Sequence, residues 1–351
     1  MRVCRATRRF STVAATSVVA AAIVASPQQP SAAPGPITIR LATLAPKDTS
    51  YHRILLEMGE KWRQAAGQRV TLTVFPGGNQ GSEADTVRRM RINQLQAAML
   101  SVGGLTEIDP AVAALQEIPM LFRSLAEEEY VRDRLRPELE KRLLAKGFVA
   151  LFWGDSGWVR FFSREPAVSP ADFKRMKIFV TASGSSKEME IMQALGYKPV
   201  AIEWSDVLTA MQTRMIDAVP TLPTLALAGQ YYVATKHMTE VNWVPLVGAT
   251  VITRQAWEAI PEDVRDPLLQ AAAEAGRKAQ EAGRQENDQS VETMKKKLGL
   301  QVHPLSPEVE QEWRAFAESV YPKIRGSLVP ADVFDRARQL VDEYRGRKAG
   351  A

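Results

Sequence analysis

The chain has 351 residues, of which 45% are apolar, 24% charged and 7% aromatic. This is the composition of a folded globular protein, and it excludes a disordered chain, a collagen-like repeat and a multi-span membrane protein. Cys4 is the only cysteine, so a disulfide framework and a cysteine-based metal site are both excluded. The three histidines, His52, His237 and His303, lack the spacing of a metal-ligand motif, and we expect neither a metal nor a cofactor.

The net charge of +5 does not indicate a nucleic-acid surface, because it is unevenly distributed. Residues 1–33 contain four arginines and no acidic residue, whereas the rest of the chain is almost neutral. A nucleic-acid-binding surface would need an excess of lysine and arginine on the folded part of the chain. The excess charge therefore belongs to the N-terminal segment.

That segment has the pattern of a signal peptide over residues 1–33. Basic residues precede an apolar run at 13–25, and small residues follow at 31–33. The run is shorter than the roughly 18 apolar residues of a spanning helix, and a membrane anchor is the alternative interpretation. We expect cleavage near Ala33 and a soluble mature chain in the periplasm, without cysteine, as suits an oxidising compartment.

Strands and helices alternate from residue 37 onward. The predicted elements of this first part are strands at 37–43, 69–75, 97–101 and 148–153, and helices at 50–66 and 82–93 and within 105–146. This order is typical of an α/β fold with a largely parallel sheet.

A second set of elements follows. Strands are predicted at 159–162, 176–181, 199–202, 216–219, 245–253 and 300–305, and helices at 183–195, 205–214, 261–297, 307–319 and 331–345. Two sets of strands in a chain of this length predict two domains. The helix at 261–297 is rich in Ala, Glu, Lys and Gln and would be about 54 Å long at about 1.5 Å per residue. It should therefore cross between the domains.

One short motif suggests enzyme chemistry. Gly154-Asp155-Ser156-Gly157 has the residues that surround the nucleophile of trypsin-like serine proteases. A serine nucleophile needs a histidine base and an orienting acid beside it, and the pattern of β-hairpins of that class is absent. We favour a turn after the strand 148–153, and keep a secreted serine hydrolase using Ser156 as the alternative function.

Two further features suggest a binding cleft. The glycine-rich loop 76–82 joins a strand to a helix and could turn backbone amides toward an anion, although it lacks the lysine of a P-loop. A structural turn is the favoured interpretation of this loop. Trp158 and Trp204 stand in polar, turn-like settings of the second set, where they could contact a ligand. Glu203 and Asp206 are better explained as solvated residues or helix caps than as an acid–base pair.

Several blocks of the chain, in their order, resemble the extracytoplasmic solute receptors of TRAP transporters, of the DctP type. The blocks are APKDTSYH (45–52), PGGNQGSEADTVRRM (76–90), EIPMLF (117–122), SPADFKRMKIFV (169–180), LGYKPVAIEWSDVLTAMQTRMID (195–217) and PEDVRDPLLQ (261–270). The resemblance covers nearly all of 36–345.

The resemblance implies a two-lobed periplasmic solute-binding fold of a type II-like kind. Each lobe would be a mostly parallel sheet flanked by helices, with the long helix bracing both lobes and a hinge that closes them around a ligand. The first lobe would comprise 36–156 with about 245–285, and the second 157–244 with about 286–351. The receptor would perform no chemistry and would deliver its ligand to the small and large subunits of a membrane permease. A stand-alone sensor that passes its ligand to a signalling partner is a further possibility.

The resemblance also indicates the site. Members commonly hold a ligand carboxylate with an arginine, but Phe179 and Val159 occupy the two corresponding positions, and Trp204 corresponds to a ligand-facing aromatic residue. We therefore expect an aromatic-lined pocket for a small organic, acid-containing ligand with an apolar or aromatic body. Backbone amides or Arg160 would hold its acidic group. The side chains expected to contact it are Asp48, Thr49, Gln80, Trp158, Arg160, Phe179, Thr181, Trp204 and Thr221.

Overall fold

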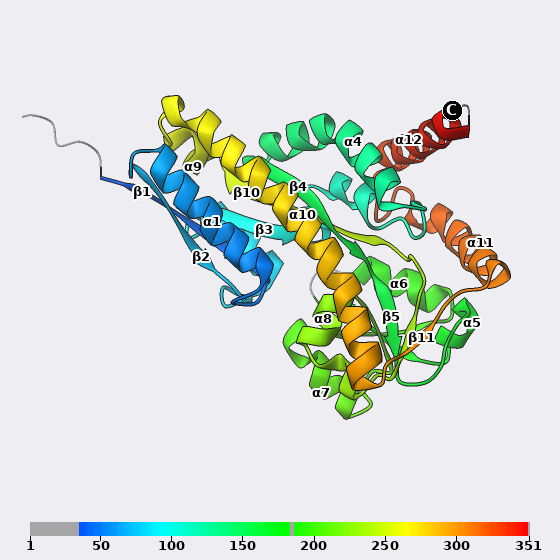
Figure 1. Cartoon of the computed structure of the whole chain (residues 1–351). Coiled ribbons are helices and arrows are strands. Elements are labelled where there is room, and N and C mark those ends of the chain that lie inside the picture. Colours follow the sequence, from blue (N-terminus) through cyan, green and yellow to red (C-terminus); the bar gives the residue numbers. More distant parts are fainter. Residues whose placement is uncertain (1–34, 183–185, 350–351) are drawn as a thin grey trace, which may run out of the picture. The chain divides into compact units, whose positions relative to one another are not determined.

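Two β-sheets organise the chain from Pro36 onward, and one long helix runs beside both of them (Figure 1). The computed structural model describes residues 35–182 and 186–349. The predicted signal peptide lies outside the described residues, as does the start of the helix expected at 183–195. Within the described part, every helix is too short or too polar to cross a membrane.

The first sheet has the strand order β2-β1-β3-β10-β4. Its strands are β1 (Ile37–Thr43), β2 (Val70–Phe75), β3 (Ala97–Ser101), β4 (Phe148–Trp158) and β10 (Pro245–Thr253). Strands β1, β2 and β3 are parallel, whereas β10 runs antiparallel to both β3 and β4. Since β4 leads the chain out of this sheet and β10 brings it back, the two strands run in opposite directions.

The second sheet has the order β11-β9-β5-β8-β6-β7. Its strands are β5 (Arg160–Ser163), β6 (Lys177–Thr181), β7 (Lys198–Ile202), β8 (Ala218–Thr221), β9 (His237–Thr239) and β11 (Gln301–His303). Strands β6, β7 and β8 are parallel, and β5 runs antiparallel to β8 and β9. The predicted α/β class with two sheets is thus confirmed, and both sheets are mixed rather than wholly parallel.

Helices connect and cover the strands. They are α1 (Ser50–Ala65), α2 (Glu83–Arg91), α3 (Val102–Thr106), α4 (Leu125–Ala145), α5 (Pro170–Phe173), α6 (Ser186–Ala194), α7 (Val207–Gln212), α8 (Pro223–Ala228), α9 (Arg254–Ala259), α10 (Glu262–Leu298), α11 (Pro307–Ile324) and α12 (Ala331–Ala349), with 3-10 turns η1 (Pro110–Leu115), η2 (Trp204–Asp206) and η3 (Tyr231–Val233). The predicted start of α2 is confirmed, because Ser82 and Asp85 form a reciprocal capping box.

The motif Gly154–Gly157 lies inside β4 and does not form the predicted turn. Strand β4 continues to Trp158 because β10 pairs with it, Val247 opposite Asp155 and Pro245 opposite Trp158. Gly157 has a φ of 90°, which favours glycine, and the chain enters the second sheet three residues later. This segment therefore crosses from one sheet to the other.

Helix α10 is 37 residues long and confirms the predicted long helix. It contacts β4, α1 and α8, and so touches elements beside both sheets (Figure 1). The contacts are close because α10 has glycine there. A Cβ atom on Gly276 would lie 2.9 Å from the Phe152 side chain, and one on Gly283 would overlap the hydroxyl of Tyr51. Gly299, in the left-handed conformation, ends the helix.

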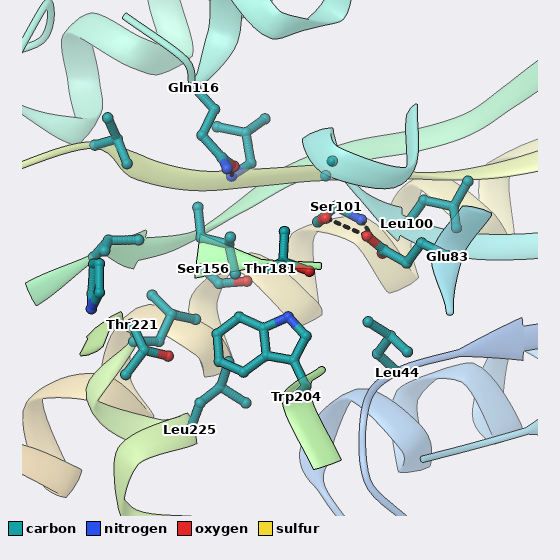
Figure 2. Close-up of a pocket in the computed structure, with 18 of the residues that line it drawn as sticks. Leu44, Glu83, Leu100, Ser101, Gln116, Ser156, Thr181, Trp204, Thr221 and Leu225 are labelled. Atoms are coloured by element: carbon teal, nitrogen blue, oxygen red, sulfur yellow. Dashed lines mark hydrogen bonds between the residues drawn. The ribbon is translucent and has the colours of Figure 1, made fainter. Parts of the chain in front are cut away.

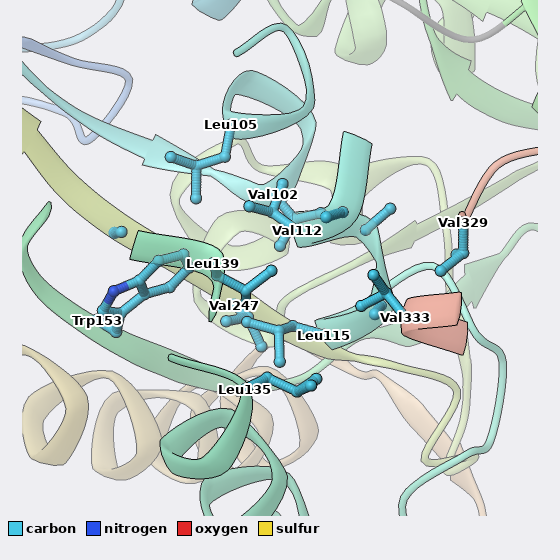
Figure 3. Packing of buried hydrophobic residues seen from close by; sticks show 14 of the residues in the cluster. Val102, Leu105, Val112, Leu115, Leu135, Leu139, Trp153, Val247, Val329 and Val333 are labelled. Carbon is cyan, nitrogen blue, oxygen red and sulfur yellow. The ribbon is translucent and has the colours of Figure 1, made fainter. Parts of the chain in front are cut away.

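A large apolar core supports the first sheet (Figure 3). It joins side chains of α3, η1, α4, β10 and α12, among them Leu105, Leu115, Leu139, Val247 and Val333. Helix α12 therefore packs on the first sheet's helices, although it comes last in the chain. A second core lies between α1, α10 and the other face of this sheet.

Replacing Gly276 with alanine should destabilise the protein by about 1–3 kcal/mol, because the added methyl group meets the buried Phe152 side chain. Gly346 in α12 is the matched control, since a Cβ atom there meets nothing within 4 Å. Gly346→Ala should leave stability unchanged or raise it by up to about 1 kcal/mol. Urea unfolding of the two variants measures the difference, and equal midpoints would contradict close packing at Gly276.

Candidate functional site

A cavity of about 1010 Å3 lies where the carboxyl ends of the parallel strands of both sheets converge. Its walls include the last residues of β1, β3, β6 and β8, which are Thr43, Ser101, Thr181 and Thr221. Ligands of open α/β sheets bind at this end of the strands, where loops and helix starts are free to vary. The location and volume are those of a small-molecule site.

Aromatic rings form much of the wall. Trp204 projects its indole into the cavity (Figure 2), and its ring centre lies 4.6 Å from that of Phe179. Phe179 is buried, whereas Trp204 retains 36% of its exposure. Further along the wall Phe161 packs against Trp243 and Trp313, with ring centres 5.7 and 5.5 Å apart. The lining therefore suits a ligand with an apolar or aromatic body.

The structure brings five of the nine expected side chains to this cavity. They are Thr49, Phe179, Thr181, Trp204 and Thr221.

The other four expected side chains lie outside the cavity wall, because local contacts hold them in other positions. They are Asp48, Gln80, Trp158 and Arg160. Arg160 alternates with the cavity-lining Val159 and Phe161 along the strand, and its guanidinium donates to Asn242 instead. Trp158 packs against the core of the first sheet.

Asp48 occupies a turn with positive φ and donates its backbone N–H to the Nδ1 atom of His52, 3.1 Å away. Gln80 accepts a hydrogen bond from Arg89 at 3.3 Å. Neither side chain belongs to the cavity wall.

The glycine-rich loop 76–82 is a structural turn, as favoured above. Gly77, Gly78 and Gly81 line the cavity, but their backbone amides donate to the carbonyls of Ala45, Thr43 and Gly78 at 2.8–3.0 Å. These three N–H groups are therefore already hydrogen-bonded within the protein and do not form an anion-binding site.

The charged residues that line the cavity are all acidic. Seven acidic residues contribute to it: Glu83, Glu107, Glu117, Asp155, Glu188, Glu203 and Glu286. Among the residues that the structure describes, no lysine, arginine or histidine lines this cavity. The wall therefore lacks the cationic side chain that would hold a carboxylate.

Burial perturbs three of these carboxyl groups. It raises the pKa of Glu117 to about 8, with a further rise from the charge of Glu188, and it also raises the pKa of Glu188. Burial raises the pKa of Glu83 as well, although this carboxylate accepts hydrogen bonds from the backbone N–H and hydroxyl of Ser101 at 2.7 and 2.5 Å (Figure 2).

Sequence reasoning did not assign a role to Glu117 or Glu188. Glu117 lies in the block 117–122, and Glu188 lies on α6 about seventy positions later in the chain. A carboxyl residue on an amphipathic helix is ordinarily solvated, so no signal in the sequence indicated that these two would share one cavity.

Ser156 has structural partners. Its hydroxyl accepts a hydrogen bond from Tyr51 at 2.6 Å, and its carbonyl accepts one from Asn287 of α10. Burial raises the pKa of Tyr51 to about 12, so the tyrosine is neutral and cannot act as a base toward Ser156. Asn287 in turn accepts hydrogen bonds from the backbone and the hydroxyl of Thr224 at 3.0 and 2.9 Å.

Asp155, the neighbour of Ser156, is also engaged. Arg284 of α10 holds its carboxylate through two hydrogen bonds of 2.9 and 2.5 Å, and Arg132 of α4 lies 3.5 Å away. The motif therefore connects β4 to α1, α4 and α10, and its geometry does not support the alternative of a serine hydrolase.

Comparisons with known proteins agree with this geometry. The family described as bacterial extracellular solute-binding protein, family 7 (DctP), matches residues 41–326. The C4-dicarboxylate-binding periplasmic protein DctP of Rhodobacter capsulatus is 24% identical over 82% of this chain and 86% of its own length.

Solved structures show the same fold. A TRAP periplasmic solute-binding protein from Shewanella oneidensis, with bound succinate, has a TM-score of 0.79 at 22% identity and covers 88% of this chain and all of its own. Another, from Pseudomonas putida F1 with bound D-glucuronate, has a TM-score of 0.77 at 23% identity and covers 86% of this chain and 96% of its own.

The family consists of receptors that bind solutes, and its members are not enzymes. With 41–326 matched, this chain belongs to family 7 of the bacterial extracellular solute-binding proteins, the DctP family.

Proposed function

We propose that this chain is the receptor of a TRAP-type secondary transporter, which captures a small organic molecule between two lobes and delivers it to a membrane permease. The observation that carries the proposal is the cavity at the carboxyl ends of both sets of parallel strands, in a chain of the DctP family. The relatives are named for C4-dicarboxylates or hold succinate and D-glucuronate. A small organic acid is therefore the ligand class that the relatives support.

The two lobes would be centred on the two sheets. The proposed division assigns 36–156 and about 245–285 to the first lobe, and 157–244 and about 286–351 to the second. Because α12 packs in the core of the first sheet, we now assign α12 to the first lobe. The crossing strand at Gly157 and the return through β10 would then form the hinge, with α10 braced across it.

The proposed location is the periplasm, after removal of a signal peptide near Ala33. It is supported by the sequence pattern of residues 1–33 and by the periplasmic relatives. The proposed partners are the small and large membrane subunits of the permease, which would receive the closed, ligand-bound receptor.

Ligand contacts are proposed for the five expected side chains that line the cavity. Trp204 and Phe179 would stack on the ligand's apolar body, and Thr49, Thr181 and Thr221 would supply polar contacts. The family resemblance leads one to expect arginine at positions 159 and 179. This chain has Val159 and Phe179 there, so its pocket is more apolar than a pocket that carries those arginines.

Protein purified from the periplasm should carry its ligand, because a ligand dissociates slowly from a closed cleft. Native mass spectrometry should show one bound small molecule per chain, and restoring that molecule to stripped protein should quench tryptophan fluorescence. The affinity of the Trp204→Ala variant for this molecule should fall about 5- to 150-fold, because stacking on an aromatic side chain contributes roughly 1–3 kcal/mol. Met215→Ala, which removes an exposed side chain outside the cavity, should bind as the parent protein does.

A chain that carries no adduct, gives no thermal shift with a broad metabolite library and reacts with a fluorophosphonate at Ser156 would contradict the receptor function.

Phe179→Arg should create a carboxylate-binding site, because it places a guanidinium in the cavity wall beside Trp204. We expect isothermal titration to show at least tenfold tighter binding of succinate or benzoate than in the parent protein. Phe179→Met is the control for loss of the ring without added charge. If a folded Phe179→Arg variant gains no affinity for either acid, Phe179 does not face the ligand.

A further inference from the structure

The seven acidic residues of the cavity wall differ in the hydrogen-bond and ion-pair partners of their carboxyl groups. Asp155 is paired with Arg284, and Glu286 accepts a hydrogen bond from Ser50. Glu83 accepts its two hydrogen bonds from Ser101, as described above. Glu107 and Glu203 are exposed to solvent, where water satisfies them.

Glu117 and Glu188 are the remaining two, and both are partly buried. Within residues 35–182 and 186–349, neither of them has a lysine or an arginine at ion-pair distance. Among the described residues, the Glu117 carboxyl group accepts a hydrogen bond only from the side-chain amide of Gln116, at 3.5 Å. Lys187 adjoins Glu188 in the chain but donates to the carbonyl of Ser327 instead.

A buried hydroxyl group of the same wall also lacks a hydrogen-bond partner. The hydroxyl of Thr221 is buried, with the residue only 3% exposed, and it makes no hydrogen bond within the described protein. Figure 2 shows Thr221 at the cavity, whose wall also includes Glu117 and Glu188. A buried hydroxyl without a partner is costly, and a ligand that donates or accepts there would remove the cost.

Resting on the proposed receptor function, we propose that the ligand bears a cationic nitrogen, an ammonium group, which Glu117 and Glu188 hold. Two partly buried carboxyl groups without a counter-charge resist being ionised together, and a cation bound beside them favours the ionised form of both. The inference concerns one end of the ligand. It is consistent with an acidic group elsewhere in the molecule, as in an amino acid.

The rest of the wall agrees with this charge. No cationic side chain of the described residues lines the cavity, and the amides of Gly77, Gly78 and Gly81 donate within the protein. Aromatic rings, which attract ammonium groups through their faces, make up the surrounding wall. A dianion would find no cationic side chain among the described residues of this wall to offset its charge.

The experiment uses matched probes on the mature protein. The probes share three carbon skeletons: 2-phenylethyl, cyclohexylmethyl and butyl. Each skeleton is tested with four head groups, which are the ammonium, the α-amino acid, the carboxylate and the alcohol. Binding is measured by thermal shift and isothermal titration. At least one skeleton should bind at least tenfold more tightly with its ammonium or amino-acid group than as the carboxylate. Glu117→Gln/Glu188→Gln should abolish that preference, and Glu281→Gln, at an exposed position of α10 outside the cavity wall, should keep it.

Three results with these probes would overturn the inference. They are binding of carboxylates alone, an ammonium preference unchanged in the folded Glu117→Gln/Glu188→Gln variant, or no binding of any probe that carries nitrogen. A shift produced by Ca2+ or Mg2+ alone and lost in the double variant would assign the pair to a metal ion and would also contradict it. Binding of carboxylates alone leaves the receptor function intact, whereas protein that carries no co-purified ligand and binds no library member refutes that function itself.

Discussion

The close approach of helix α10 to β4 and α1 is the constraint on which the rest of the structure depends. Gly276 and Gly283 bring the helix backbone to within contact of Phe152, Tyr51 and Ser156, where any side chain would collide. One helix can then hold the first sheet through Arg284 and Asp155 and the helix beside the second sheet through Asn287 and Thr224. The cavity is positioned by this connection, since both sheets turn the carboxyl ends of their parallel strands toward it.

The polar contacts of the crossing segment explain why a protease-like motif occurs in a receptor. Asp155 and Ser156 lie in the stretch of β4 that leaves the first sheet, where backbone groups lose regular sheet partners. Asp155 accepts from the N–H of Gly157 at 3.1 Å as well as from Arg284, and Ser156 is held by Tyr51 and Asn287. The same residue types that suit a catalytic serine therefore satisfy a buried crossing of the chain.

Local patterns in the sequence predicted local structure well. Alternating polarity placed β1, and short apolar runs placed β3 and β10, with the bounds they have, and Ser82 marked the start of α2. Long-range pairing could not be predicted in this way: β4 extends past Trp153 because of β10, almost a hundred residues later. The site followed the same division. Phe179 and Trp204 were identified from their motifs, whereas Arg160 lies outside the cavity because alternation along the strand turns it toward Asn242. Glu117 and Glu188, about seventy positions apart in the chain, line one cavity only in the folded protein.

If a bound ligand closes two lobes about the crossing segment, a distance between the two lobes should shorten when the ligand binds. Residues 34–351 contain no cysteine, so Ile92→Cys and Met215→Cys, at exposed positions beside the two sheets, can carry a pair of spin labels in a chain that begins after Ala33. The account predicts that the co-purified molecule, restored to stripped protein, shortens this distance. A control pair at Ile92 and Leu56, both beside the first sheet, should keep its distance. An unchanged distance between Ile92 and Met215 with bound ligand would contradict capture by closure.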